Sequence, residues 1–405
     1  MAAPTRGQPV RELHTQNTMP EPQVTISARG LRRIRSGHPW IYRSDICTAT
    51  AAAGDVVRVD NEQGRFVGRA FYSDRSQITL RMLTRENVPV DRTFLKERIR
   101  SAAARRETWV SDTEVFRLCY SEGDLLPSLI VDRYADVLVL QTLSQATERL
   151  KSEIASVLVE LFSPRGILER NDPRVRLHEG LPQSVSVLYG EVPPTLLAKM
   201  NSLQFEFDLF HGQKTGAFLD QRENYRAAAA YAHGDALDCF AYNGAFALTM
   251  APRCSHVEAI DLSAPALERA ERNAGLNGFS NVSFRVANCF DALRELEAAG
   301  RQFDTIVLDP PAFAKDRASI GAALRGYKEI NLRSLKMLRA GGYLITCSCS
   351  HHISEPEFLQ TVAEAALDAR RELTIVERRT QSRDHPIILT IPETSYIKFF
   401  VCSVL

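Results

Sequence analysis

The sequence predicts an α/β protein in which a doubly wound parallel sheet at the C-terminus follows a small β-rich module and a central α+β region. Three patterns support this fold. Short apolar strands alternate with helical stretches from residue 203 onward, as in parallel sheets covered by helices. Residues 23–95 hold strand-like runs separated by glycine and asparagine turns. Apolar residues recur every three or four positions over residues 146–161, which is the spacing of an amphipathic helix.

These patterns divide the chain into four parts. We expect a disordered tail over residues 1–22, the β-rich module over 23–95, the central α+β domain over 96–194 and the doubly wound domain over 195–405. In the β-rich module, strands are expected at 56–59 and 77–83. A helix over about 94–106 leads into the central domain, where strands are expected at 116–118, 128–131, 137–140 and 166–170.

The first crossover of the C-terminal sheet is the best defined. A strand at 236–240 leads through a small-residue turn into a helix, and a second strand at 257–261 ends on Asp261. This arrangement binds nucleoside-bearing cofactors, because the terminal carboxylate accepts hydrogen bonds from ribose hydroxyls. The turn lacks the G-x-G-x-x-G pattern that a pyrophosphate needs, and only Gly244 is present. A cofactor without phosphates, S-adenosyl-L-methionine, fits better, although Asp261 could also cap the next helix.

Composition excludes several classes of protein. With 405 residues, 44% of them hydrophobic, the chain can bury more than one core. No apolar run approaches the ~18 residues of a membrane span, and residues 1–22 lack the apolar centre of a secretory signal. The eight cysteines are scattered and form no CxxC pair. We therefore expect a cytoplasmic protein without a membrane segment and without a bound metal.

The formal net charge of +1 conceals a polarity along the chain. Residues 1–100 hold 17 Lys and Arg against 10 Asp and Glu. Arginines bind phosphates and aromatic rings stack on bases, so the basic run near the N-terminus has the composition of an RNA-binding surface. The candidate residues are Arg32, Arg33, Arg35, His38 and Trp40. The alternative is a solvated charged face whose aromatic side chains pack inward.

Two strand ends carry the expected chemistry. Asp309 follows the apolar run 305–308 and opens an Asp-Pro-Pro segment, and Cys349 follows the apolar run 343–345. Buried parallel strands end at one edge of their sheet, so this carboxylate and this thiol can face one substrate. Cys347 competes with Cys349 because it lies two residues upstream, on the same side of an extended strand. Both cysteines could instead be small buried hydrophobic residues.

Four segments give the chain a specific resemblance over nearly its whole length after the tail. They are Gly37-His38-Pro39-Trp40 with Gly54-Asp55; the stretch HGQKTGAFLDQR from His211 to Arg222; Asp309-Pro310-Pro311-Ala312-Phe313; and Ser348-Cys349-Ser350 followed by Asp384-His385-Pro386. Together they resemble the RlmI-type family of large-subunit ribosomal RNA cytosine-5 methyltransferases. The resemblance implies a PUA domain, a central domain and a class I methyltransferase domain with a Rossmann-like sheet. It also implies 23S ribosomal RNA as the substrate and a homodimer.

The resemblance further implies roles for individual residues. Cys349 is expected to add to C6 of cytosine, because C5 cannot attack a sulfonium methyl group unaided, and Asp309 is expected to hold the edge of the base. Lys214 joins the expected RNA-binding residues. The expected cofactor-binding residues are Gln221, Arg222, Asp238, Tyr242, Asn243, Gly244, Asp261, Asn288 and Asp309. Asn288 stands where the family often carries an acid, but its amide oxygen can still accept a bond from adenine. Arg222 could instead pair with Asp220 on the surface.

Three other functions stay open at this point. The chain could methylate an amine or ring nitrogen of guanine or adenine in RNA, using Asp309 without a covalent step. It could be a noncatalytic RNA-binding assembly factor that only occupies cofactor. It could also act on a small molecule, which would leave the basic N-terminal module without a role.

Overall fold

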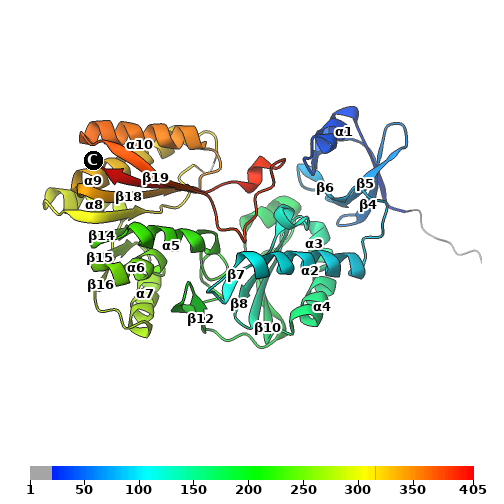
Figure 1. Ribbon diagram of the computed structural model, residues 1–405. Helices are drawn as coiled ribbons and strands as arrows, with labels where there is room; N and C mark the ends of the chain where they lie inside the picture. The colour runs from blue at the N-terminus through cyan, green and yellow to red at the C-terminus, as the bar shows by residue number, and fades with distance from the viewer. Residues whose placement is uncertain (1–20, 315) are drawn as a thin grey trace, which may run out of the picture.

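The computed structural model describes residues 21–314 and 316–405 (Figure 1). Apart from its last two residues, the tail expected over 1–22 lies outside the described residues. Within the described part, the chain forms three sheets of six, five and seven strands and one two-stranded hairpin. The α/β fold class is therefore confirmed. The expected boundary between residues 95 and 96 falls inside a helix, α2 (Arg92–Trp109).

The N-terminal module is a six-stranded sheet in the order β2-β6-β5-β4-β1-β3. Its strands are β1 (Gln23–Ile26), β2 (Trp40–Tyr42), β3 (Ile46–Thr50), β4 (Val56–Asn61), β5 (Phe66–Tyr72) and β6 (Ile78–Thr84). The arginine run forms a helix, α1 (Ala28–Arg35), which begins where the Ser27 hydroxyl accepts a hydrogen bond from the amide of Gly30. The residue pattern of this module predicts only strands and turns, so this helix differs from the expectation.

The central domain is a five-stranded sheet in the order β11-β10-β9-β8-β7. Its strands are β7 (Val115–Tyr120), β8 (Leu129–Tyr134), β9 (Val137–Thr142), β10 (Gly166–Asn171) and β11 (Ser184–Gly190). The helices α2 and α4 (Lys151–Phe162) pack on one face, where Ile99 and Val157 share a core with Leu118 and Leu140. The single helix expected over 146–161 is divided at Leu150 into α3 (Gln145–Arg149) and α4.

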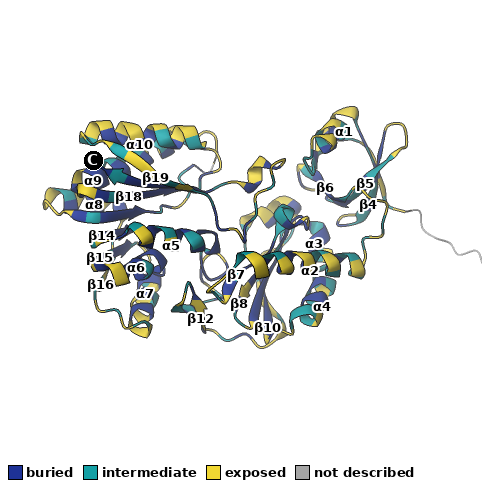
Figure 2. Ribbon diagram, viewed as in Figure 1, coloured by how far each residue is buried: buried dark blue, intermediate teal, exposed yellow. Residues whose placement is uncertain are grey.

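The other face of the central sheet packs toward the C-terminal domain. Val139 and Leu168 belong to one continuous core with Phe207 of the hairpin β12 (Leu196–Met200) and β13 (Leu203–Phe207) and with Phe246 and Phe399 of the C-terminal domain. This core fixes the central domain against the last domain. In Figure 2 the strands of both sheets are largely buried, and exposed residues lie mainly on the outer faces of the helices.

The C-terminal domain is a seven-stranded sheet in the order β16-β15-β14-β17-β18-β20-β19. The strands are β14 (Gly234–Cys239), β15 (Cys254–Asp261), β16 (Val282–Val286), β17 (Phe303–Leu308), β18 (Leu338–Ser348), β19 (Leu373–Arg379) and β20 (Lys398–Val404). All neighbouring pairs are parallel except those made by β20, which runs antiparallel to β18 and β19. The chain order reverses between β14 and β17, and ligands bind at such a switch point.

Helices cover both faces of this sheet (Figure 1). The helices α5 (Arg222–Tyr231), α6 (Ala245–Met250) and α7 (Ala264–Leu276) contribute to the core shared with the central domain. The helices α8 (Cys289–Ala298), α9 (Ile320–Met337) and α10 (Glu355–Ala369) bury a second core on the opposite face. None of the described helices combines the length and the apolar character needed to cross a bilayer.

Candidate active site

The carboxyl ends of neighbouring parallel strands bring the candidate residues to one edge of the C-terminal sheet. The strand register pairs Cys239 with Leu308, and Leu308 with Thr346. Asp309 therefore follows β17 between the turn after β14 and the end of β18. The site expected from separate strand ends is assembled at the switch point of the sheet.

The turn after β14 is held by Asp261 at the end of β15. Its carboxylate accepts a hydrogen bond of 2.9 Å from the amide of Tyr242 and one of 2.8 Å from the amide of Ser263. Ser263, and not Asp261, is the N-cap residue of α7. Gly244 has a φ of +80°, and a Cβ there would lie 3.0 Å from that of Ala270. The turn therefore requires glycine at this position.

Two buried polar atoms at this turn have no hydrogen-bond partner among the described residues. They are Oδ1 of Asp238 and Nδ2 of Asn243. The other carboxylate oxygen of Asp238 accepts a bond of 3.0 Å from the amide of Ala247, and burial raises the pKa of Asp238 well above its usual value. Leaving such atoms unpaired is costly, so these residues fit a ligand with polar and cationic groups, such as the amino acid end of S-adenosylmethionine.

Asn288 is exposed at the start of α8. Its side-chain oxygen already accepts a hydrogen bond of 2.9 Å from the amide of Phe290, which makes Asn288 the N-cap of that helix. The oxygen keeps a second lone pair for a further donor. Contact with adenine therefore stays a prediction.

The segment HGQKTGAFLDQR folds over the cofactor turn. The amide of Gln213 donates a 2.7 Å hydrogen bond to the hydroxyl of Tyr242, and the ring of Phe218 meets the ring of Tyr242 edge-on at 5.2 Å. Lys214 has a side chain that is 54% exposed, and its Nζ lies 3.1 Å from Oδ2 of Asp220. This loop places a cation and an acid near Asp309 and Cys349, at the ends of β17 and β18.

Two side-chain amides, those of Gln221 and Asn224, form a hydrogen-bonded chain that ends on Asp309. Nε2 of Gln221 donates a 2.8 Å hydrogen bond to Oδ1 of Asp309, while the amide of Asn224 donates a 2.6 Å bond to Oε1 of Gln221. Burial, together with the charge of Asp220, raises the pKa of Asp309 to about 7, and the bond from Gln221 acts in the opposite direction. This carboxyl can therefore change its protonation state near neutral pH.

Cys349 lies just beyond the end of β18 and is half-buried. Its sulfur is 3.8 Å from the carbonyl oxygen of Pro310. The pKa of the Cys349 thiol is raised to about 11, mainly by burial and secondly by the negative charge of Asp309. Cys347 is fully buried within β18, and its pKa lies well above the usual value. Of the two cysteines, Cys349 is the one that a substrate can reach.

Arg222 is buried in α5, and its guanidinium lies 3.6 Å from Oδ1 of Asp384. The surface pair of Asp220 with Arg222 that the sequence allowed is wrong, because Asp220 binds Lys214 and the hydroxyl of Tyr396 instead. The pKa of Asp220 falls to about 2, since these partners and His385 outweigh the effect of its burial.

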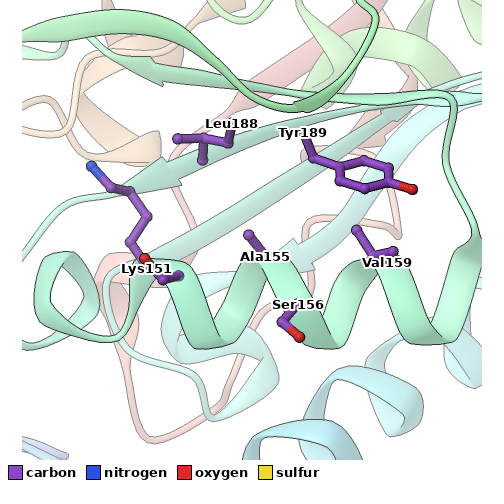
Figure 3. A pocket seen from close by; sticks show the side chains of 7 residues that line it. Lys151, Ala155, Ser156, Val159, Leu188 and Tyr189 are labelled. Carbon is purple, nitrogen blue, oxygen red and sulfur yellow. The ribbon is translucent and has the colours of Figure 1, made fainter.

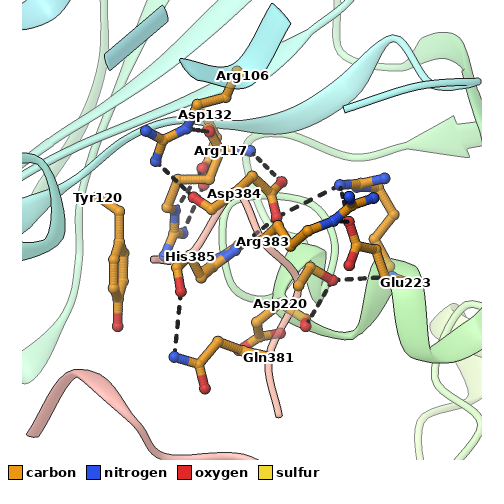
Figure 4. A network of polar contacts seen from close by, with 12 residues as sticks. Arg106, Arg117, Tyr120, Asp132, Asp220, Glu223, Gln381, Arg383, Asp384 and His385 are labelled. Carbon is orange, nitrogen blue, oxygen red and sulfur yellow. Dashed lines mark hydrogen bonds and ion pairs between the residues drawn. The ribbon is translucent and has the colours of Figure 1, made fainter. Parts of the chain in front are cut away.

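Asp384 is the centre of a buried network that joins the central sheet to the C-terminal domain (Figure 4). Its carboxylate accepts a 3.0 Å bond from the amide of Arg117, and its carbonyl accepts a 2.7 Å bond from Arg106. The side chain of Arg117 is paired with Asp132, which also accepts a 2.7 Å bond from Thr215. The HGQKTG loop and the segment around Asp384 are thus anchored on the same strands.

The expected RNA-binding residues of the N-terminal module divide into two groups. Arg32 and Arg35 are exposed on α1, and the guanidinium of Arg33 lies 4.6 Å from the ring centre of Tyr42. In contrast, Nε2 of His38 lies 3.2 Å from Glu393, and Nε1 of Trp40 donates a 2.8 Å bond to Glu122. His38 and Trp40 therefore contact the other domains.

Two cavities lie outside this cluster. One, of about 350 Å³, is bounded by α4 and β11, with Lys151, Val159, Leu188 and Tyr189 in its wall (Figure 3). The other, of about 340 Å³, lies between the N-terminal module, α2 and residues 388–391. Neither is lined by Asp309 or Cys349.

Three residues close to the site were not predicted from the sequence. Asp220 lies inside the quoted HGQKTGAFLDQR segment but was not assigned to the site, and Tyr396 carried no motif. Lys398 is a single lysine in the strongly apolar run 397–402, which is itself a signal that such a charge has a partner or a function. Among the described residues no group of three His, Cys, Asp or Glu side chains is placed to hold a metal.

Comparisons with known proteins agree with this geometry. Residues 24–85 match the model of a PUA-like domain, and residues 147–393 match that of an S-adenosylmethionine-dependent methyltransferase. Two solved structures share the fold at 18% identity, each over 95% of this chain and 100% of its own: a putative methyltransferase complexed with SAH (TM-score 0.82) and a putative SAM-dependent methyltransferase from Streptococcus mutans (TM-score 0.79).

Curated relatives match over almost their full length. A protein named ribosomal RNA large subunit methyltransferase I from Pseudoalteromonas translucida is 38% identical over 94% of this chain and 99% of its own length. One with the same name from Tolumonas auensis is 40% identical over 90% of this chain and 94% of its own. The PUA-like and methyltransferase matches confirm the resemblance found in the sequence. The chain therefore belongs to the ribosomal RNA large subunit methyltransferase I family of S-adenosylmethionine-dependent enzymes.

Proposed function

We propose that this enzyme methylates C5 of a cytosine in 23S ribosomal RNA. The observation that carries the proposal is the accessible Cys349 thiol beside Asp309, next to the cofactor turn, at the ends of neighbouring parallel strands. The name of the curated relatives supports the large-subunit substrate. Cytosine is supported because methylation at C5 requires a covalent nucleophile, and Cys349 would supply one. We further propose that the enzyme acts in the cytoplasm.

In the proposed reaction, the sulfur of Cys349 forms a bond to C6 of the cytosine and moves an electron pair toward C5. S-Adenosyl-L-methionine supplies the methyl group that C5 takes from its sulfonium sulfur. Loss of the C5 proton then returns the electrons to the ring and breaks the bond between C6 and Cys349. Asp309 holds the base throughout: when ionised it accepts from the N4 amino group, and when protonated it donates to N3.

The cofactor is proposed to lie along the turn after β14. Asp238 and Asn243 would satisfy their unpaired atoms on its amino acid end, and Asp261 would accept bonds from the ribose. Tyr242 and Gly244 shape the turn, and Asn288 faces adenine. Gln221 acts on Asp309 through its hydrogen bond. Arg222 is buried against Asp384, so we assign it to the support of the site and not to direct contact with cofactor.

RNA is proposed to contact the exposed arginines of α1 and Lys214 beside the active site. Arg32 and Arg35 are exposed, and Lys214 is half-exposed next to Asp220. Such side chains neutralise phosphates and give binding that weakens with salt. A homodimer is proposed from the resemblance alone, and light scattering of the purified protein tests it.

The decisive experiment combines undermethylated ribosomal RNA with methyl-labelled cofactor and maps the product by nucleoside mass spectrometry. The wild-type protein and Cys347→Ala should form 5-methylcytidine, whereas Cys349→Ala should lose several orders of magnitude in rate. A wild-type reaction without 5-methylcytidine would refute the proposal.

A second function is favoured by one observation, the raised pKa of the Cys349 thiol, which keeps the resting sulfur protonated at neutral pH. An enzyme that methylates an amine or ring nitrogen of guanine or adenine would use Asp309 and need no thiolate. In that case Cys349→Ala would keep near-full turnover, and the labelled nucleoside would be a methylated purine.

A further inference from the structure

His351 is an exposed histidine two residues after Cys349, and the proposed reaction has not used it. Its ring lies against the ring of Tyr396, with the ring centres 5.5 Å apart and the planes inclined by 29°. Tyr396 and Cys349 both pack against the core shared with the central domain. The intervening Ser350 turns the other way, since its hydroxyl lies 3.1 Å from the hydroxyl of Tyr327 in α9. His351 therefore lies on the same side of the sheet as the reactive sulfur.

The tyrosine behind this histidine is held in place by its own contacts. The hydroxyl of Tyr396 donates a 2.9 Å hydrogen bond to Oδ2 of Asp220, and the same oxygen accepts a 3.1 Å bond from Nζ of Lys214. That Nζ lies 6.0 Å from the ring centre of Tyr396, and the lysine side chain is more than half exposed. One fixed tyrosine thus carries an exposed aromatic ring and stands beside an exposed cation.

This pair of groups suits a nucleotide. One face of the His351 ring is covered by Tyr396, and because the residue is exposed, the other face is open to a ligand. Bases of single-stranded RNA stack on such aromatic faces, while lysine neutralises the phosphates between them. A cytosine that is attacked at C6 must leave the base stack, because the sulfur approaches the face of its ring. The base next to it then lacks a stacking partner.

We propose that His351 binds the RNA by stacking on a base next to the target cytosine. This inference rests on the proposed function of the site. Residues two apart in an extended chain are at most about 7 Å apart, so adjacent nucleotides can reach Cys349 and His351. Lys214 then neutralises a phosphate of the same stretch. Every base has an aromatic face, so this contact contributes affinity and orientation without selecting the identity of the neighbour.

The test uses the full-length protein with S-adenosylhomocysteine and a short single-stranded RNA in which cytidine alternates with 2-aminopurine. The emission of this fluorescent base falls when it stacks on an aromatic ring, and every cytidine of the probe has it as a neighbour. Wild-type protein should quench the emission on binding. His351→Gln removes the ring but keeps a polar side chain, so affinity should fall about tenfold and most of the quenching should be lost. His351→Phe keeps a ring and should keep both.

The matched control is His352→Gln, which changes the next exposed histidine and should leave affinity and quenching unchanged. Absence of quenching with the wild type, or equal quenching with His351→Gln, would overturn the inference. So would equal losses in His351→Gln and His351→Phe, because the imidazole nitrogens and not the ring would then contact the RNA. The assay involves no methyl transfer. A missing 5-methylcytidine therefore counts against the proposed function, whereas unchanged quenching in His351→Gln counts only against this role of His351.

Discussion

The side-chain amide of Gln221 donates a 2.8 Å hydrogen bond to the carboxylate of Asp309, across 88 positions of the chain. Asn224 fixes the orientation of this amide, because it donates to Oε1 of Gln221 and leaves Nε2 facing the acid. The two residues come from different motifs, the HGQKTGAFLDQR segment and the DPP turn. Their contact joins the two motifs at one site.

Gln221→Leu should shift the pH profile of methyl transfer. The bond from Gln221 favours the ionised form of Asp309, so its loss should raise the Asp309 pKa from about 7 by a further unit or so. In the plot of kcat/KM against pH, the limb that reflects titration of Asp309 should move toward higher pH by the same amount. Gln221→Glu is unsuitable as a control because it adds a charge, whereas Gln204→Leu changes an amide remote from Asp309. A limb that stays in place in Gln221→Leu would show that Asp309 is not the titrating group.

Asp309→Asn should stabilise the protein above neutral pH. The Asp309 carboxyl has a pKa of about 7 in the folded chain, above the value of about 3.9 in an unfolded chain. The native state thus binds the proton more tightly, and the free energy of unfolding falls as the pH rises from about 4 to 7.

The asparagine variant avoids this loss while it keeps an oxygen for Gln221. Its free energy of unfolding at pH 8 should exceed that of the wild type by about 2 kcal/mol. This is roughly half of the free energy that corresponds to a shift of three pKa units, because Asp309 keeps some contact with solvent. Urea denaturation at pH 4 and pH 8 measures the difference, which should vanish at the lower pH. Asp368→Asn, an exposed acid, is the control. Equal stability of Asp309→Asn and wild type at pH 8 would argue against a raised pKa of Asp309 in the folded protein.

Asp238→Asn should weaken cofactor binding without loss of stability. The carboxyl group of Asp238 is fully buried with one oxygen unpaired, and burial raises its pKa because its charged form is costly to bury. A neutral amide avoids this cost. Affinity for S-adenosylhomocysteine should fall at least tenfold in calorimetry, since a cationic amino group would lose its partner. Unfolding in the absence of cofactor should show equal or greater stability. Unchanged affinity would place the cofactor elsewhere.

The sequence predicted the positions of the strand ends because buried strands and the turns that end them leave a local pattern. Asp309 and Cys349 each follow an apolar run, and Asp261 ends another. In contrast, α1 buries only Gly30 and Ile34, so its apolar period is too weak to distinguish it from a turn. The local sequence was therefore enough to predict an element only where buried apolar residues recur along it.

Pairings between distant segments left no such pattern. Arg222 lies close to Asp384, in the last part of the chain. Asp220 accepts a hydrogen bond from Tyr396, which is 176 positions away. Which acid a given arginine meets depends on how three domains pack, and neighbours in sequence are only one of the possibilities. The pairing of Asp220 with Arg222, which the sequence left open as an alternative, does not form for this reason.

The two groups of residues in the N-terminal module should separate in RNA binding. Arg32→Ala combined with Arg35→Ala removes two exposed cations, so the slope of log affinity against log salt should become less steep by about one to two. Filter binding to a ribosomal RNA fragment at several salt concentrations measures the slope. Arg301→Ala, just before β17 and away from the strand ends, is the matched control. A slope that is the same in the double variant and the wild type would remove α1 from the RNA contact.

Trp40→Phe gives the opposite pattern. The indole of Trp40 donates to Glu122 of the central domain, and phenylalanine keeps an aromatic ring but loses this bond. The free energy of unfolding should fall by about 1 kcal/mol while the salt slope of RNA binding stays unchanged. Glu122→Leu removes the acceptor of the same bond and should cost a similar amount. If Trp40→Phe instead lowers RNA affinity at unchanged stability, the ring stacks on a base and its contact with Glu122 gives way when RNA binds.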